Sequence, residues 1–263
     1  MEKIVFRASE LSDVVKGKSF DGFEIDMEIV NNVKGVKFVE CLFTDTTFIN
    51  TIFENCVFED CTFNKVGFSV ATKLIGCEFN NCNIMYSGFR PSMALIKSSF
   101  EDCDIQHCTI NSLCYSEVAI NDCKMSDVTF KGLTMIKPKI ENSELVSVTF
   151  SSCEMSTGSF KDTNFVKTDI IDCKISNTRF KDAGTLRGLY PMRSDIDTDF
   201  LHFTTEGVRL CYLPKEDICW GSLGEGCVSD IIDKQSINTP NLVVDMVLDY
   251  FSKVADTFKN KEL

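Results

Sequence analysis

Cysteine is the residue of this sequence that is best suited to chemistry, because its thiolate can bind a metal ion, act as a nucleophile or form a disulfide. The 263 residues include 14 cysteines but no Cys-x-x-Cys pair, the spacing that often brings two thiolates onto one zinc ion. Several cysteines instead follow one another at 20 or 21 residues: Cys41, Cys61, Cys82, Cys103 and Cys123. Such a series indicates one structural position repeated along the chain. We therefore predict no metal site and no cofactor.

Other groups that could support catalysis are few. The sequence has two histidines, which lie far apart, and the pattern around His107 places it on the surface. The glycine-rich stretch ICWGSLGEGC (218–227) lacks the Lys-Ser/Thr of a phosphate-binding loop. A reactive thiol at Cys211, Cys219 or Cys227 would lack the neighbouring histidine or acid that activates a nucleophile. We therefore predict no catalytic residues.

The charge and the ends of the chain limit its partners and its compartment. A net charge of −12 and a pI near 4.7 disfavour direct binding to nucleic acid or to an anionic membrane, and favour a protein partner with a basic surface. Residues 1–15 contain no apolar stretch of signal-peptide length, and no segment is apolar enough to span a bilayer. Free thiols are typical of a reducing compartment. We expect a cytoplasmic protein, in the bacterial cytosol or, if it is secreted, in the host cytosol.

The elements that position these residues follow from a period of five. The stretch CLFTDTTFINTIFENCVFEDCTF (41–63) has phenylalanine at every fifth position, which fits neither an α-helix nor a plain strand. With one extra residue in each of two places, the same register runs through 29 apolar or aromatic positions. These centres are Phe38, Phe43, Phe48, Phe53, Phe58, Phe63, Phe68, Leu74, Phe79, Ile84, Phe89, Leu95, Phe100, Ile105, Ile110, Tyr115, Ile120, Met125, Phe130, Met135, Ile140, Leu145, Phe150, Met155, Phe160, Phe165, Ile170, Ile175 and Phe180.

A small residue usually stands two places before each centre. Most of these are Cys, Ser or Thr, as at Cys41, Thr46, Cys82 and Ser143. Residues two apart in extended backbone share a face, so the centre and the small residue are predicted to point inward together. The residues between and after them are mostly polar and are predicted to face solvent.

This pattern resembles the pentapeptide-repeat family, whose motif is a small residue, a polar residue, Leu or Phe, and two polar residues. The resemblance covers about residues 33–182. It implies an all-β solenoid, a right-handed quadrilateral parallel β-helix in which four pentapeptides complete one coil. We expect residues 1–32 to form an N-terminal cap, residues 33–182 the β-helix, and residues 183–263 a mixed, partly helical segment without repeats.

Folding the sequence at four repeats per coil gathers acids on one side of the β-helix. The outward residues on that side include Glu59, Asp60, Glu101, Asp102, Asp122, Glu141, Asp162 and Asp182. They could form an electrostatic docking surface for a basic partner, or only a solvated face that keeps the protein soluble. The two extra residues, in SVATK (69–73) and RPSMA (90–94), fall one coil apart on one side. They indicate stacked bulges, either for recognition or from neutral drift.

The ends of the chain depart from the repeat. KIVFRA (3–8) predicts a strand, SELSDVVKG (9–17) a short helix opened by Ser9, and SFDGFEIDMEIV (19–30) degenerate first repeats. DFLHFTTEGVRLCYLP (199–214) predicts one or two strands.

Residues 239–263 predict a helix that Thr239 caps. Its apolar face could pack against the end of the β-helix, form a homodimer, or dock a further domain. That face includes Val244, Val247, Leu248, Phe251, Val254 and Phe258.

The sequence leaves two functions open. A β-helix followed by a partly helical segment resembles the substrate-binding region of the SopA/NleL type III secreted effectors, virulence proteins that are HECT-like ubiquitin ligases. By that resemblance the chain is a non-catalytic recognition module, and any ligase domain lies outside it. The acidic side and the early start of the repeats also resemble the Qnr/MfpA group of DNA mimics. That resemblance implies binding to DNA gyrase and topoisomerase IV, with quinolone resistance as the result.

Overall fold

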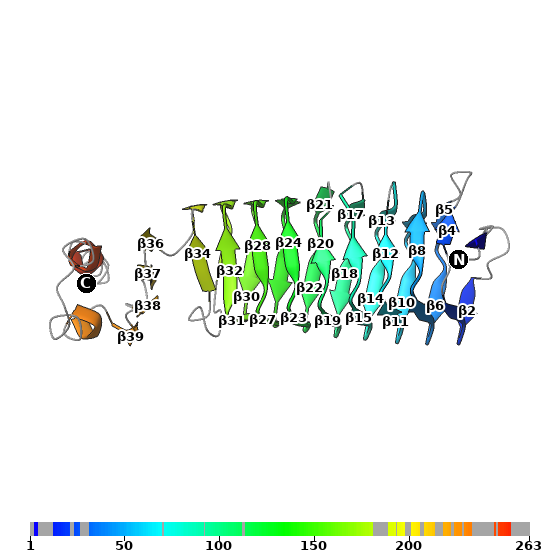
Figure 1. The fold of residues 1–263 in the computed structure, drawn as a ribbon, viewed down its shortest axis with the longest axis horizontal. Helices are drawn as coiled ribbons and strands as arrows, with labels where there is room; N and C mark the ends of the chain where they lie inside the picture. The colour runs from blue at the N-terminus through cyan, green and yellow to red at the C-terminus, as the bar shows by residue number, and fades with distance from the viewer. Residues whose placement is uncertain are drawn as a thin grey trace.

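The computed structural model describes residues 3–4, 13–21, 24–26, 32–69, 71–91, 93–111, 114–180, 189–192, 194–197, 201–205, 208–213, 218–221, 224–227, 229–232, 245 and 247–253. Most of these residues form four parallel sheets that are the four sides of a long rod, with the N-terminal strands at one end and the C-terminal segment at the other (Figure 1). Successive strands belong to the four sheets in turn, so each coil contributes one strand to each side.

Side 1 of the rod consists of β2 (Val14–Lys16), β6 (Lys37–Val39), β10 (Val57–Glu59), β14 (Glu78–Asn80), β18 (Ser99–Glu101), β22 (Ala119–Asn121), β26 (Lys139–Glu141) and β30 (Ser159–Lys161). Side 2 consists of β3 (Ser19–Asp21), β7 (Leu42–Thr44), β11 (Thr62–Asn64), β15 (Asn83–Met85), β19 (Asp104–Gln106), β23 (Lys124–Ser126), β27 (Glu144–Val146) and β31 (Asn164–Val166).

Side 3 consists of β1 (Lys3–Ile4), β4 (Glu24–Asp26), β8 (Thr47–Ile49), β12 (Gly67–Phe68), β16 (Gly88–Phe89), β20 (Thr109–Ile110), β24 (Thr129–Lys131), β28 (Thr149–Ser151), β32 (Thr168–Ile171) and β34 (Leu189–Met192). Side 4 consists of β5 (Asn32–Lys34), β9 (Ile52–Glu54), β13 (Lys73–Ile75), β17 (Ala94–Ile96), β21 (Cys114–Ser116), β25 (Thr134–Ile136), β29 (Glu154–Ser156), β33 (Lys174–Ser176) and β35 (Asp195–Asp197).

The fivefold register is confirmed by burial. All 29 predicted centres are buried, and none is more than 4% exposed. Centres of successive coils stack, as in the column Phe38, Phe58, Phe79 and Phe100, whose neighbouring ring centroids are 4.7–4.9 Å apart. One large side chain from each side thus fills the rod, and its burial supplies the main stabilising free energy of the fold.

The small residues before the centres are also inward, as the pattern predicts. Their hydroxyls and thiols donate to backbone carbonyls; Cys82 Sγ, for example, lies 3.3 Å from the carbonyl oxygen of Phe58 in the preceding coil. Polar side chains are therefore tolerated inside the rod because each finds an acceptor.

The corner after each strand explains why Asp, Asn and Gly are frequent there. The corner residue adopts a left-handed conformation, with φ of 53° at Asp102 and 52° at Asp122. Asp, Asn and Gly tolerate this region better than other residues. The backbone N–H of Asp122 donates to the carbonyl of Glu141 in the next coil at 3.2 Å, so each corner also links two coils.

The N-terminal residues differ in part from their predictions. The helix expected over residues 9–17 is wrong at Val14–Lys16, which form β2 and pair in parallel with β6. Val15 is buried between two exposed neighbours, the alternation of a strand, and it pairs with Phe38. Asp13 and Gly17 are bends, and residues 9–12 lie outside the described residues. The strand expected in residues 3–8 is confirmed at β1, and the degenerate repeats expected in residues 19–30 are confirmed at β3 and β4. The other residues of these two ranges lie outside the described residues.

The C-terminal segment begins by continuing two sides of the rod. β34 pairs with β32, and β35 pairs with β33, beyond the expected end of the repeats at residue 182. Pro191 lies within β34, the last described strand of side 3, where a missing N–H faces no further described strand.

A separate antiparallel sheet follows: β36 (Leu201–Thr205), β37 (Val208–Leu213), β38 (Ile218–Gly221) and β39 (Gly224–Gly226). Its first two strands confirm the prediction for residues 199–214.

The helix expected near the C-terminus is present at residue 245 and residues 247–253, and a short helical turn occupies 229–232. Leu248 and Phe251 are each 2% exposed, and the Phe251 ring stacks on Tyr212 of β37 with centroids 5.0 Å apart. Part of the predicted apolar face therefore packs within the chain. Val244, Val254 and Phe258 lie outside the described residues. No helix in the described part is long and apolar enough to cross a membrane.

Candidate functional site: the acidic side

The cysteines do not form a reactive or metal-binding cluster in the structure. The described residues contain no group of three His, Cys, Asp or Glu side chains that could hold a metal ion. The cysteine column, which consists of Cys41, Cys61, Cys82, Cys103 and Cys123, is 1–3% exposed. Burial raises the pKa of Cys108, an interior thiol between β19 and β20, to about 11. A thiol with a raised pKa stays protonated at neutral pH, so Cys108 acts as a small interior residue.

Outside the column, two cysteines are partly exposed. Cys227 lies after β39, and Cys114 stands on an outward position of β21. Of the three cysteines considered as reactive thiols, Cys211 and Cys219 are buried. The exposure of Cys114 could have been predicted from the sequence. Cys114 directly precedes the centre Tyr115, whereas the inward cysteines stand two places before a centre.

His107 faces outward, as the register predicts. Its ring stacks on Tyr86 of the preceding coil at 4.9 Å, and its Nδ1 lies 3.4 Å from Asp127 Oδ2 of the next coil. The stack covers one corner of side 2 and presents no nucleophile or acid–base partner beyond Asp127. The side chain of His202 lies outside the described residues.

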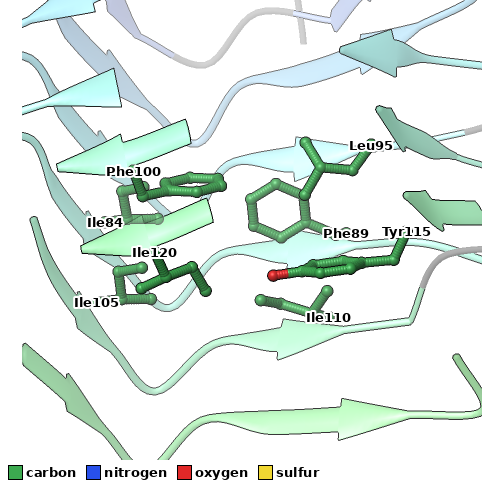
Figure 2. A pocket seen from close by; sticks show the side chains of 8 residues that line it. All are labelled: Ile84, Phe89, Leu95, Phe100, Ile105, Ile110, Tyr115 and Ile120. Atoms are coloured by element: carbon green, nitrogen blue, oxygen red, sulfur yellow. The ribbon is translucent and has the colours of Figure 1, made fainter. Parts of the chain in front are cut away.

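The interior offers no room for a substrate in the described coils. A cavity of about 10 Å³ lies where the phenylalanine columns give way to aliphatic residues, and it is large enough for about one water. Figure 2 shows its apolar lining and the Tyr115 ring reaching across the interior toward Ile120. The Tyr115 hydroxyl has no hydrogen-bond partner among the described residues.

The four sides differ sharply in charge. We compared seven strands of each side, each with the residues up to the next strand: β6 to β30 of side 1, β7 to β31 of side 2, β8 to β32 of side 3 and β5 to β29 of side 4. Side 1 carries nine acids and three lysines, a formal charge of −6. Side 2 carries four acids and three lysines (−1), side 3 two acids, one lysine and one arginine (0), and side 4 three acids and four lysines (+1). Half of the net charge of −12 is therefore concentrated on one side of the rod.

The structure brings the predicted acidic residues together. Glu59, Glu101 and Glu141 are on strands β10, β18 and β26 of side 1. The aspartates follow in the left-handed corners of the same side: Asp60, Asp102, Asp122 and Asp162. Asp182 lies outside the described residues. Two further acids of this side, Glu40 and Glu78, were not in the predicted set. We call the seven described residues of the prediction the acidic side.

Neighbouring groups neutralise the ends of the acidic side more than its centre. Lys37 pairs with Glu59, and Lys161 Nζ lies 3.5 Å from Asp162 Oδ2. In contrast, Glu101, Asp102 and Asp122 form no ion pair among the described residues. Asp122 only accepts a hydrogen bond from Asn121 Nδ2 at 2.7 Å. The centre of side 1 therefore presents uncompensated negative charge to solvent.

A family model described as pentapeptide repeats matches residues 32–69 in eight copies, and the structure carries the same register to Phe180. The described residues between 32 and 180 thus form a β-helix of the pentapeptide-repeat type. No curated protein matches this chain by sequence.

Solved structures are similar only at low identity. QnrB1, a plasmid-mediated fluoroquinolone resistance protein, is 17% identical over 70% of this chain and 91% of its own, with a TM-score of 0.49. HetL from Nostoc sp. is 10% identical over 68% of this chain and 87% of its own, with a TM-score of 0.23. The A-module of the Azotobacter vinelandii epimerase AlgE4 is 7% identical over 70% and 76%, with a TM-score of 0.30. Likenesses this distant carry no argument about function.

Proposed function

We propose that this protein is a non-catalytic interaction module whose acidic side docks onto a basic surface of a partner protein. The observation that carries the proposal is the charge of −6 on side 1 beside charges between −1 and +1 on the others. An array of fixed, uncompensated charges attracts an oppositely charged surface and raises its association rate. The rigid coils hold that array in place without any cost of ordering a loop.

The geometry favours a partner that normally binds DNA. Strands about 4.8 Å apart place the net charge of side 1 at about one negative charge per 5 Å, roughly a third of the line density of B-DNA. The acids also lie on one face of a straight rod. These features support the DNA-mimic function, in which the partner is DNA gyrase or topoisomerase IV in the bacterial cytosol. Recognition of a basic host protein by a secreted effector is the second candidate, and it would use the same side.

The test uses purified full-length protein in gyrase and topoisomerase IV supercoiling and relaxation assays. The wild-type chain should inhibit or protect these enzymes in competition with DNA. The variant E101K/D102K/D122K/D162K should fold normally, because all four side chains are exposed, and should lose this effect. The control variant E54K/E117K/E144K/E154K makes the same total change of charge, with one substitution on side 2 and three on side 4, and should keep the effect on these enzymes.

If the wild-type chain has no effect on either enzyme, the DNA-mimic function is excluded and the secreted-effector function is the candidate that remains. Equal loss of effect in the two variants would contradict a specific role for the acidic side.

A further inference from the structure

Side 4 carries an unusual number of outward isoleucines. Ile52, Ile75, Ile96 and Ile136 lie on β9, β13, β17 and β25, and each points away from the filled interior. Ile75 pairs in register with Ile96, and both are partly exposed, while Ile136 is 43% exposed. Side 3 has two outward isoleucines, Ile49 and Ile171, at distant coils, and the compared strands of sides 1 and 2 have none. We call the four residues of side 4 the isoleucine surface.

Unpaired cations border this surface. Between residues 32 and 110 the chain has six basic residues, and three of them form ion pairs with an acid of a neighbouring coil: Lys34 with Glu54, Lys37 with Glu59, and Lys65 with Asp45. The other three, Lys73, Arg90 and Lys97, form no ion pair among the described residues.

These three cations lie beside the isoleucine surface, and beyond residue 110 Lys124, Lys131 and Lys167 on sides 2 and 3 also form no ion pair among the described residues. Lys73 is the first residue of β13, Arg90 precedes the turn that leads into β17, and Lys97 occupies the corner after β17. Their positions place positive charge at both edges of side 4, within a chain whose net charge is −12.

The two insertions form a ridge along one edge of side 4. Each is a tight turn between side 3 and side 4, closed by Thr72 N–H donating to Ser69 O at 3.1 Å and Met93 N–H donating to Arg90 O at 3.0 Å. Thr72 and Met93 are buried anchors, whereas Arg90 is exposed. β12 pairs with β16 and β13 with β17, so the two turns lead from the same side to the same next side one coil apart.

We propose that the isoleucine surface binds an apolar segment of a partner protein that carries acidic residues at its edges. Isoleucine side chains would pack on the apolar face of that segment, and Lys73, Arg90 and Lys97 would pair with its carboxylates. This arrangement of an apolar centre and a charged rim is typical of protein interfaces. The positive charge of Lys73, Arg90 and Lys97 favours an acidic partner, whereas the acidic side favours a basic partner. The two surfaces are on different sides of the rod, so the proposal does not depend on the function of side 1.

Fluorescence anisotropy with two synthetic peptides tests the proposal. One is a fluorescein-labelled 18-residue peptide of leucine and glutamate at helical spacing, and the other has lysine at every glutamate position. The wild-type chain should bind the glutamate peptide at 150 mM salt. The variant K73E/R90E/K97E should lose affinity by about tenfold or more. The control K124E/K131E/K167E, with the same charge change on sides 2 and 3, should bind as the wild type does.

A second pair of variants tests the apolar contribution. I75N/I96N should weaken binding of the glutamate peptide, whereas I49N/I171N on side 3 should not. E101K/D102K/D122K/D162K should not weaken this binding, which separates this proposal from the function of the acidic side. The proposal is overturned if the wild-type chain binds the glutamate peptide no better than the lysine peptide. It is also overturned if either control variant loses as much affinity as its counterpart.

Discussion

Phe100 and Glu101 are consecutive residues of β18 that belong to two different regions of the molecule. Phe100 is 3% exposed and stacks on Phe79 with ring centroids 4.7 Å apart, whereas Glu101 faces solvent on side 1. All 29 interior centres are apolar or aromatic, but the outward residues of the four sides carry formal charges from −6 to +1. The inward residues therefore determine the fold, and the outward residues are free to vary with the partner.

The largest expected effect comes from placing a charge in the interior. Phe130 is 0% exposed and stacks on Phe150 at 4.7 Å. Phe130→Asp buries a carboxylate with no partner, at a cost of several kcal/mol, which is comparable to the total stability of a domain. Circular dichroism should show an unfolded or aggregated chain. Thr129→Asp, one residue away and outward, should fold normally. A folded Phe130→Asp protein would contradict the separation of interior and exterior.

The buried thiol of Cys108 predicts a loss of stability in alkali. Burial raises the pKa of Cys108 from 9.0 to about 11, so between these values the unfolded chain loses the proton while the folded chain keeps it. The free energy of unfolding should fall as the pH rises from 9 to 11, with roughly 2–3 kcal/mol from Cys108. Urea titrations across this range measure the effect. Cys108→Val is the control, because the stacked position of the next coil is Val128, and its pH dependence should be shallower.

The Tyr115 hydroxyl is a polar group in the apolar interior of the rod. It is fully buried without a hydrogen-bond partner among the described residues and borders the apolar cavity of Figure 2. Tyr115→Phe should therefore raise the free energy of unfolding by about 1 kcal/mol, because it removes an unsatisfied polar group. Tyr86→Phe, on the exposed surface, should change it by less than about 0.5 kcal/mol. A destabilised Tyr115→Phe protein would show that the hydroxyl has a partner in solution.

The rate of thiol labelling compares the outward and inward cysteines in the native protein without a substitution. Cys114 and Cys227 are partly exposed and should react first with a maleimide in the native protein. Cys82 and Cys103 are each 2% exposed and should react only when the coils open. Mass spectrometry of timed samples identifies the order of labelling. If Cys82 is labelled as rapidly as Cys114, the inward position of the cysteine column is incorrect.

The sequence predicted the interior well because the period of five leaves little freedom. Each coil must present a large centre such as Phe58 and a small partner such as Cys61 at a fixed spacing, and both are buried as expected. The ends were less predictable, since no repeat constrains them. The polar residues around Val14–Lys16 favour a short helix by sequence alone, but this segment pairs with β6 and is a strand. Pro191 similarly fits β34 because that strand is the last described strand of its side.

The outer sides were predicted in part. Folding the sequence at four repeats per coil gathered Glu101, Asp102 and Asp122 correctly, since corners and strands follow the register. It could not show which acids are neutralised, because the pairing of Lys37 with Glu59 joins two coils through flexible side chains. The isoleucine surface was overlooked although Ile75 and Ile96 follow their centres directly, a position that the motif reserves for polar residues.

The dependence of association rate on salt tests the central claim most directly. The association rate of the wild-type chain with immobilised gyrase, measured between 50 and 500 mM salt, should fall steeply as salt rises, because screening weakens the attraction to side 1. E101K/D102K/D122K/D162K should show circular dichroism like that of the wild type, a much slower association and little salt dependence. A variant that associates as fast as the wild type, with the same salt dependence, would contradict recognition through the acidic side.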